Sequence, residues 1–338
     1  MLDIPMAPDY RAALEAVALF DASAAGRLIM RDRDRAALLH RLSTNQIEKL
    51  AAGDGTQTVL TTPIGRIIDV LTVHVLPDEE ALLLITSPVQ REPVYKHLRK
   101  NIFFNDKVKV EDVSERFAEL HLYGPQVWQV LDVLGLVQEP RTQNPEPRTL
   151  SELSLFSIQR VTHAGVALYV APIKGFTGQA VALYVPMDQK AGLCAALLAA
   201  GATELSAASY EILRVEAGFG SYGHELSLEY IPLETGLWEA ISFDKGCYVG
   251  QEIIARMESR NRMAKMLRGV RVRSGGVLTP GELRGEGKDA GLVTSVADSP
   301  RFGTIGLAYV RTAFAAAGTM LIRVDSEQSV EVFELPFR

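Results

Sequence analysis

The sequence predicts an α+β protein with two similar units, of ferredoxin-like type, followed by an all-β barrel. Two stretches repeat the order strand, turn, strand, helix, which is typical of helices packed on antiparallel sheets. After about residue 261, short β-type runs are separated by Gly and Pro, which favours a small barrel or roll. We therefore expect a body over 1–260, with units at approximately 1–115 and 116–260, and a C-terminal β-barrel domain over 261–338.

The first repeat is 71–101, preceded by a short helical segment at 32–45. It reads as a strand, a turn at Pro77-Asp78, a strand and a helix. Ser87 is a suitable N-cap, and Pro88 suits the first helical position.

The second repeat is 165–202, preceded by a helical segment at 124–136. Its turn is Gly-rich, Asp188 is the expected N-cap of its helix, and Gly201 is expected to stop that helix. The Pro-rich, polar segment 139–150, between the two units, is expected to be a surface loop.

The barrel is predicted from β-type runs, and a helix is expected just before it. That helix covers 251–259, with Ile253, Ile254 and Met257 on one face. The β-type runs are 267–283, 291–300, 303–310 and 319–325.

Composition limits the class of protein. The chain has 338 residues, 47% apolar, with a formal charge of −6, which predicts a globular protein without general attraction to nucleic acid. No basic segment precedes an apolar core at the N-terminus, so no secretory signal is expected, and the longest apolar stretch, 191–202, is too short to span a membrane. Two cysteines cannot form a disulfide framework. We expect a cytoplasmic protein with reduced thiols.

One cysteine lies in an unusual context, the stretch KGCYVGQE. Gly246 and Gly250 allow close approach of the backbone to a ligand. Lys245 and the start of the predicted helix both favour a thiolate at Cys247. The alternative is a small residue packed beneath a sheet, and Cys194, in an apolar helix, is interpreted in that way.

The sequence favours no stably bound metal or cluster. An iron–sulfur cluster usually needs about four thiolates, and the chain has two. The six histidines show no zinc-type spacing, and the phosphate-loop, dinucleotide and nucleophile-elbow motifs are absent. One thiol suffices for transient ligation, thiol exchange or nucleophilic chemistry.

The cysteine motif also carries a family resemblance. KGCYVGQEIIAR, with RMAKMLRGVRV after it, resembles the signature of YgfZ-type proteins. These are tetrahydrofolate-binding relatives of the glycine-cleavage T protein that assist iron–sulfur cluster assembly or repair. Further stretches are similar to the T-protein superfamily: LFDASAAGRLIMRDRDRAALLHRLSTNQI, GRIIDVLTV, LRVEAGFGSYGHEL, IPLETGLWEAI and IGLAYV. The resemblance implies three domains around a central folate pocket.

The chain departs from the aminomethyltransferase pattern in one place. Ala24-Ala25 stand where aminomethyltransferases of the glycine cleavage system typically carry a His-Met pair, and those enzymes lack the motif cysteine. Both differences weigh against transfer of a methylene group from a lipoyl arm. Neither excludes folate binding.

The resemblance assigns two carboxylates to the pocket. Glu216 is implied to pair with the N–H donors of the pterin ring, since a carboxylate accepts from two adjacent donors. The alternative is an ion pair with Arg214. Asp69 matches an aspartate near the reactive folate nitrogens, where it can accept a proton, within one residue of register. The alternative is a polar residue at a strand end.

Three further residues are candidate folate contacts. Tyr222 offers a ring face or a hydroxyl, or else packs in the core. Asn45 is a ligand contact or a structural turn residue. Lys245 is a candidate contact because it lies two residues before Cys247.

The basic stretch 256–273 has seven basic residues and one acid. It is interpreted as a solvated face, or as a site for the polyglutamate tail of folates or for a phosphate-rich partner such as tRNA. Aromatic interleaving is absent, which makes nucleic acid the weaker partner.

Three functions follow from these features. The first is a tetrahydrofolate-binding accessory protein for iron–sulfur assembly or repair, with Cys247 as the working thiol and transient client or assembly proteins as partners. The second is a tetrahydrofolate-dependent aminomethyl or methyl transferase. The third is a folate-binding scaffold without catalysis, in which Cys247 only packs.

Overall fold

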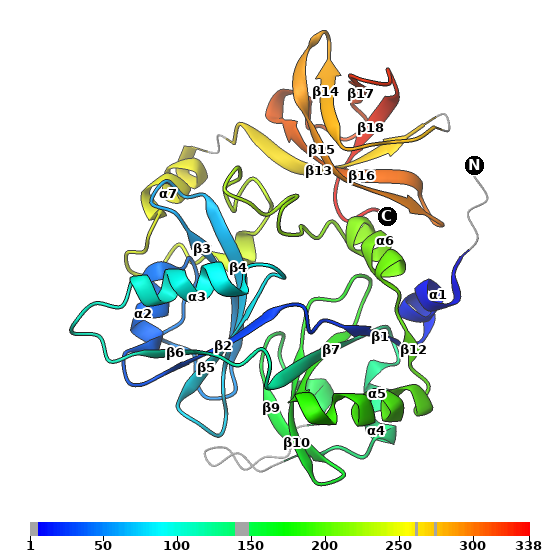
Figure 1. Ribbon diagram of the computed structural model, residues 1–338. Coiled ribbons are helices and arrows are strands. Elements are labelled where there is room, and N and C mark those ends of the chain that lie inside the picture. Colours follow the sequence, from blue (N-terminus) through cyan, green and yellow to red (C-terminus); the bar gives the residue numbers. More distant parts are fainter. Residues whose placement is uncertain (1–5, 139–148, 261–262, 274–275) are drawn as a thin grey trace.

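The computed structural model describes residues 6–138, 149–260, 263–273 and 276–338. It consists of two open sheets and one closed barrel (Figure 1). This confirms the predicted α+β class and the C-terminal barrel. Most of the Pro-rich segment at 139–150 lies outside the described residues.

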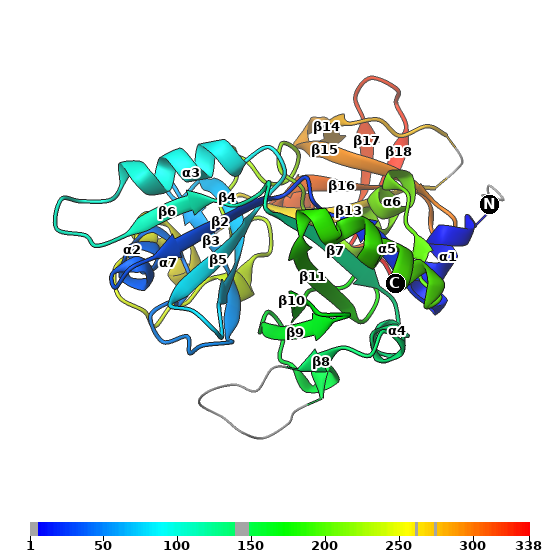
Figure 2. The same cartoon turned by 60° about the horizontal axis from the view of Figure 1, so that its bottom comes forward.

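The first sheet is antiparallel, in the order β3-β4-β5-β2-β6. Its strands are β2 (Gly26–Arg31), β3 (Gly55–Thr61), β4 (Ile67–Val75), β5 (Ala81–Thr86) and β6 (Lys109–Asp112). Helices α2 (Arg35–Leu42) and α3 (Arg91–Lys100) pack on one face through Leu38, Leu39, Val94 and Leu98. Figure 2 shows α3 lying along this sheet.

The prediction that Ser87 is the N-cap of α3 and Pro88 its first helical residue is wrong. The helix begins at Arg91, after Gln90. Residues 87–90 form a tight turn, in which the Gln90 N–H donates to the Ser87 carbonyl and Val89 has a positive φ of 64°. The Ser87 N–H instead donates to Asp69.

The second sheet has seven strands in the order β12-β1-β7-β11-β10-β9-β8. They are β1 (Ala18–Asp21), β7 (Phe117–Tyr123), β8 (Val137–Gln138), β9 (Gln159–His163), β10 (Val166–Pro172), β11 (Ala180–Pro186) and β12 (Thr203–Glu204). Strand β1 pairs with β7, although it lies within the stretch expected to form the first unit. Tertiary pairing thus places one strand of the first unit in the second sheet.

One face of the second sheet packs against α4 (Val127–Val133) and α5 (Lys190–Ala199). A 3-10 turn at Met187–Gln189 precedes α5, so Asp188 lies in that turn and is not the N-cap. Gly201 follows α5 with a φ of 104°, as its predicted role as a helix stop requires. Helices α1 (Pro8–Glu15) and α6 (Ala207–Ala217) pack beside this sheet.

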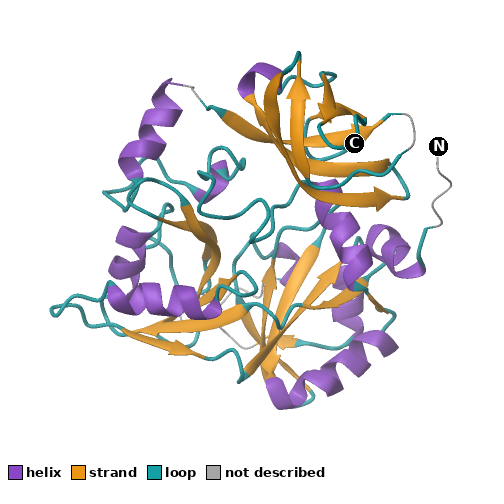
Figure 3. Ribbon diagram, turned by 45° about the horizontal axis from the view of Figure 1, so that its top comes forward, coloured by secondary structure: helices purple, strands orange, loops and turns teal. Residues whose placement is uncertain are grey.

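The barrel closes in the order β13-β16-β15-β14-β17-β18. Its strands are β13 (Lys265–Val272), β14 (Gly281–Gly285), β15 (Lys288–Ser299), β16 (Gly303–Arg311), β17 (Met320–Arg323) and β18 (Ser329–Phe333). Helix α7 (Gln251–Arg260) precedes the barrel, as predicted. It lies beside the first sheet, near β3 (Figures 1 and 3). Within the described ranges, no helix is both long and apolar enough to cross a membrane.

Candidate functional site

Asp69 is a buried carboxyl at the third position of β4, before the part of that strand that pairs with β5. Strand alternation places it on the same face as Leu71 and Val73, and its side chain is fully buried. Its Oδ1 accepts from the Val70 N–H at 2.9 Å and its Oδ2 from the Ser87 N–H at 3.0 Å. Burial raises the pKa of Asp69 to about 7, although these hydrogen bonds oppose the shift. The group is therefore suited to exchange a proton near neutral pH.

Tyr222 lies next to this carboxyl. Its ring is half-buried and packs against the hydrophobic cluster that contains Val215. Burial together with the charge of Asp69 raises the pKa of Tyr222. The structure thus brings Asp69 and Tyr222 together from segments about 150 residues apart.

Glu216 lies in a different environment, where α6 meets α1 and the barrel. Its Oε1 accepts from the Tyr10 hydroxyl at 2.7 Å and the Ser299 hydroxyl at 2.5 Å, and its Oε2 is 3.5 Å from Arg301 Nη1. These three partners leave one acceptor position of Oε2 open, since a carboxylate has about four such positions.

The alternative of an ion pair between Glu216 and Arg214 is wrong. Arg214 pairs with Glu211 and with Glu225, at 2.5 and 3.1 Å respectively.

Asn45 and Lys245 are both bonded to the protein. Asn45 Nδ2 donates to the Gln57 and Glu239 carbonyls, which gives it the structural turn role. The Lys245 ammonium donates to the carbonyls of His40, Ser43 and Asn45 at 2.5, 2.7 and 2.8 Å, so all three of its N–H groups are used. Lys245 therefore anchors the C-terminus of α2, contrary to the expectation that it supports a thiolate or a ligand.

Cys247 is exposed, so the reading in which it packs beneath a sheet is wrong. Cys194 is half-buried against the core of the second sheet. Gly250, after Cys247, has a φ of 86°, and a Cβ there would lie 2.7 Å from the Thr62 carbonyl oxygen. Its close approach is therefore to the β3–β4 turn and not to a ligand. Among the described residues, no group of three or more metal-binding side chains is present.

Among its described residues, the basic stretch does not form a single free patch, and Arg262 lies outside them. Strand β13 alternates, so Lys265 and Arg271 lie on one face and Arg268 on the other. Arg268 donates to the Ala315 carbonyl at 3.0 Å, and Arg273 pairs with Glu331 at 2.9 Å. These contacts support the interpretation as a solvated face with local partners.

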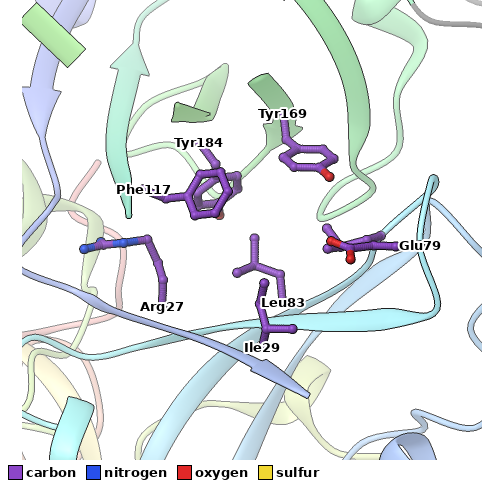
Figure 4. A pocket seen from close by; sticks show the side chains of 8 residues that line it. Arg27, Ile29, Glu79, Leu83, Phe117, Tyr169 and Tyr184 are labelled. Atoms are coloured by element: carbon purple, nitrogen blue, oxygen red, sulfur yellow. The ribbon is translucent and has the colours of Figure 1, made fainter. Parts of the chain in front are cut away.

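A cavity lies between the two open sheets, with Arg27 at one end and Glu79 at the other (Figure 4). The rings of Phe117, Tyr169 and Tyr184 line it from the second sheet. None of the candidate residues from the sequence lines this cavity.

A polar row on β7 was not found from the sequence. Glu119, His121 and Tyr123 occupy one face of the strand, and Glu119 Oε1 lies 2.7 Å from His121 Nε2. His121 Nδ1 lies 2.9 Å from the Tyr123 hydroxyl. The available signal was three polar residues at every second position of FAELHLY, which is typical of one face of a strand.

Comparison with known proteins gives a consistent result. Residues 4–245 match the GCVT N-terminal domain, and residues 265–337 match the glycine cleavage T-protein C-terminal barrel domain. A chloroplastic "putative transferase" of Arabidopsis thaliana is 31% identical over 95% of this chain and 71% of its own length. An aminomethyltransferase of Caldanaerobacter subterraneus is 28% identical over 93% of this chain and 82% of its own.

A solved structure shares the fold. The crystal structure of glycine cleavage system aminomethyltransferase T from Bartonella henselae superposes with a TM-score of 0.83 at 19% identity, covering 98% of this chain and 88% of that one.

Proposed function

Because the chain belongs to the family of the GCVT N-terminal domain and the T-protein C-terminal barrel, we propose that it is a tetrahydrofolate-dependent one-carbon transferase of the aminomethyltransferase type. The names of its relatives support this reaction class. The observation that carries it is Asp69, a buried carboxyl that can hold or release a proton near pH 7.

The residues around Asp69 suit a folate ring. The carboxyl accepts hydrogen bonds when ionised and donates one when protonated, so it can pair with a ring N–H or a ring nitrogen. Tyr222 adds a half-buried ring and a hydroxyl beside it. When bound, tetrahydrofolate supplies the nitrogens that carry the one-carbon unit. Asp69 and Tyr222 would hold its reactive side, and Asp69 would exchange the proton.

The donor is proposed to differ from a lipoyl arm. Ala24 is exposed and Ala25 is buried at the turn between β1 and β2. Neither offers the polar group of the His-Met pair found in glycine-cleavage enzymes.

Replacement of Asp69 tests the proposal. We expect purified protein to bind tetrahydrofolate and to form methylene-tetrahydrofolate from an aminomethyl donor. Asp69→Asn should lower the transfer rate by about 100-fold or more, because it removes proton exchange but keeps the side-chain size. Asp132→Asn, at an exposed position on α4, is the matched control. Unchanged transfer in Asp69→Asn would remove Asp69 from the reaction, and no folate binding by the wild type would refute the function.

Exposure of Cys247 favours a second candidate, an accessory role in iron–sulfur cluster assembly or repair of the YgfZ type. Its thiol is open to solvent, which transient ligation or exchange with a client protein requires. The neighbouring Tyr248 is buried and Lys245 is anchored, so the segment holds the thiol at a defined place on the surface. Client and assembly proteins are the partners that this role implies.

A Cys247→Ser variant tests the accessory role. In cells depleted of the protein, we expect it to restore the activity of iron–sulfur enzymes at least fivefold less well than wild type, at equal abundance. Cys194→Ser is the control, because that thiol packs on a core. Full restoration by Cys247→Ser would leave the transferase as the only function proposed.

A further inference from the structure

The loop between α3 and β6, residues 101–108, projects away from the rest of the molecule (Figures 1 and 2). It carries two adjacent phenylalanines, of which Phe103 is 64% exposed and Phe104 is 93% exposed. Of the large apolar side chains that the structure describes, Phe104 is the most exposed. Single exposed apolar residues are ordinary, but two neighbouring rings on a projecting loop indicate a contact surface.

A closed turn holds the two rings outward. The Asp106 N–H donates to the Phe103 carbonyl at 2.9 Å, and the Phe103 N–H donates to Asp106 Oδ2 at 2.7 Å. Arg41 of α2 pairs with the same carboxylate, and its guanidinium lies 5.2 Å from the centre of the Phe103 ring. Phe104 therefore lies within a turn that is bonded across its base and attached to α2.

The far end of the loop is attached as well. The Lys107 N–H donates to Asp34 Oδ2 at 2.8 Å, and the Lys107 carbonyl accepts from the Asp34 N–H at 3.2 Å. A loop that is fixed at both ends loses little conformational freedom when it binds a partner. The exposure of the rings is thus a property of the fold.

Positive charge surrounds the two rings. Arg99 and Lys100 end α3, just before the loop, and Lys107 follows the turn; all three side chains are exposed. Arg99 Nη1 donates to the neutral Tyr95 hydroxyl at 3.3 Å. Within the described part of the chain, none of these three cations has an ion pair with a carboxylate.

The acids of α3 and of the loop attachments do not cancel this charge. Each of them has another cation: Glu92 pairs with Lys96 at 3.0 Å, Asp34 with Arg33 at 3.4 Å, and Asp106 with Arg41. The chain as a whole has a formal charge of −6. Because exposed charges more than about 8 Å apart are largely screened at physiological ionic strength, the local surplus decides what the loop attracts.

An apolar tip surrounded by cations matches the surface of an anionic membrane. Aromatic rings enter the headgroup region there, while Lys and Arg remain at the level of the lipid phosphates. Single-stranded nucleic acid also combines phosphates with ring stacking, but it needs a groove with free ring faces. Here the tip projects, and Arg41 covers one face of Phe103. The lipid surface is therefore the better match.

We propose that the loop 101–108 docks this protein reversibly on anionic lipid. Phe103 and Phe104 enter the headgroup region, and Arg99, Lys100 and Lys107 contact the lipid phosphates. The contact needs neither folate nor the Cys247 thiol, so it goes beyond both proposed functions and does not depend on them.

Co-sedimentation of the full-length protein with vesicles tests the apolar part of this contact. We expect binding to mixed vesicles of phosphatidylcholine and phosphatidylglycerol, and much weaker binding to phosphatidylcholine alone. Phe104→Ser should weaken binding to the mixed vesicles by about fivefold or more, since an inserted ring loses its apolar burial. Val277→Ser, at an exposed position before the second barrel strand, is the matched control and should bind as the wild type does.

The charged part is tested in the same assay. Lys100→Gln and Lys107→Gln should each weaken binding by about fivefold, and added salt should weaken wild-type binding. Lys288→Gln, at an exposed position on the barrel, is the control. Urea unfolding checks that every variant is folded, and its midpoint should not move because these side chains are exposed.

Two outcomes would overturn the proposal. The first is a wild-type protein that does not bind the mixed vesicles at low salt. The second is Phe104→Ser protein that binds them as tightly as the wild type. In the first case, binding of bulk tRNA that Phe104→Ser abolishes would assign the loop to nucleic acid instead.

Discussion

At the scale of single residues, burial determines the chemistry of Asp69. The carboxyl has two backbone N–H partners but no cation bonded to it, and it lies among aliphatic side chains of the first sheet. Desolvation outweighs the two hydrogen bonds, so the protonated form is favoured up to about pH 7.

The shift at Asp69 predicts how stability depends on pH. Its pKa rises from 3.8 to about 7 on folding, so the folded state binds the extra proton between these values. Wild-type stability should therefore fall from about pH 4 to pH 7 and level off above it, by up to about 4 kcal/mol at about 1.4 kcal/mol per pKa unit.

Asp69→Asn should lack this loss, and urea unfolding of both proteins from pH 4 to 9 measures the difference. Parallel stability curves for the two proteins would show that folding does not raise the pKa of Asp69. Asp132→Asn should follow the wild type.

At the scale of elements, the segment before α7 is attached at both ends. Lys245 bonds three carbonyls at the end of α2, and the Thr61 hydroxyl donates to the Val249 carbonyl at 2.5 Å. The positive φ of Gly250 allows the chain to turn against the β3–β4 loop. Cys247 lies exposed between these attachments, and its place is therefore set by the first sheet.

At the scale of the whole molecule, Glu216 connects three parts. Its carboxylate bonds Tyr10 of α1 and Ser299 at the end of β15, and its backbone carbonyl accepts from the Phe337 N–H at 2.9 Å. The Glu216 carboxylate, which is bonded through both of its oxygens, thus holds the barrel against α6.

Glu216→Gln is expected to act mainly on stability. It keeps the shape but loses the charge-assisted bonds, so it should lower the free energy of unfolding by about 1–3 kcal/mol. Tetrahydrofolate affinity should change less than threefold, measured by titration at a temperature where both proteins are folded. Glu211→Gln, which alters a half-exposed carboxylate on the same helix, is the control. A tenfold loss of affinity at unchanged stability would instead establish Glu216 as a pterin contact.

The sequence by itself determined the α+β class, the barrel and the helix after Cys247, because hydrophobic period and Gly and Pro positions act over short distances. Through the family resemblance it also offered Asp69 as a candidate site residue. Only the tertiary structure decided the partners of Lys245 and Glu216, which lie about 200 residues away in the chain. The buried ion pair of Glu119 likewise depends on Arg27, 92 residues earlier. Local pattern carries no information about such pairs, since a buried charge takes whichever partner the packed sheets bring to it.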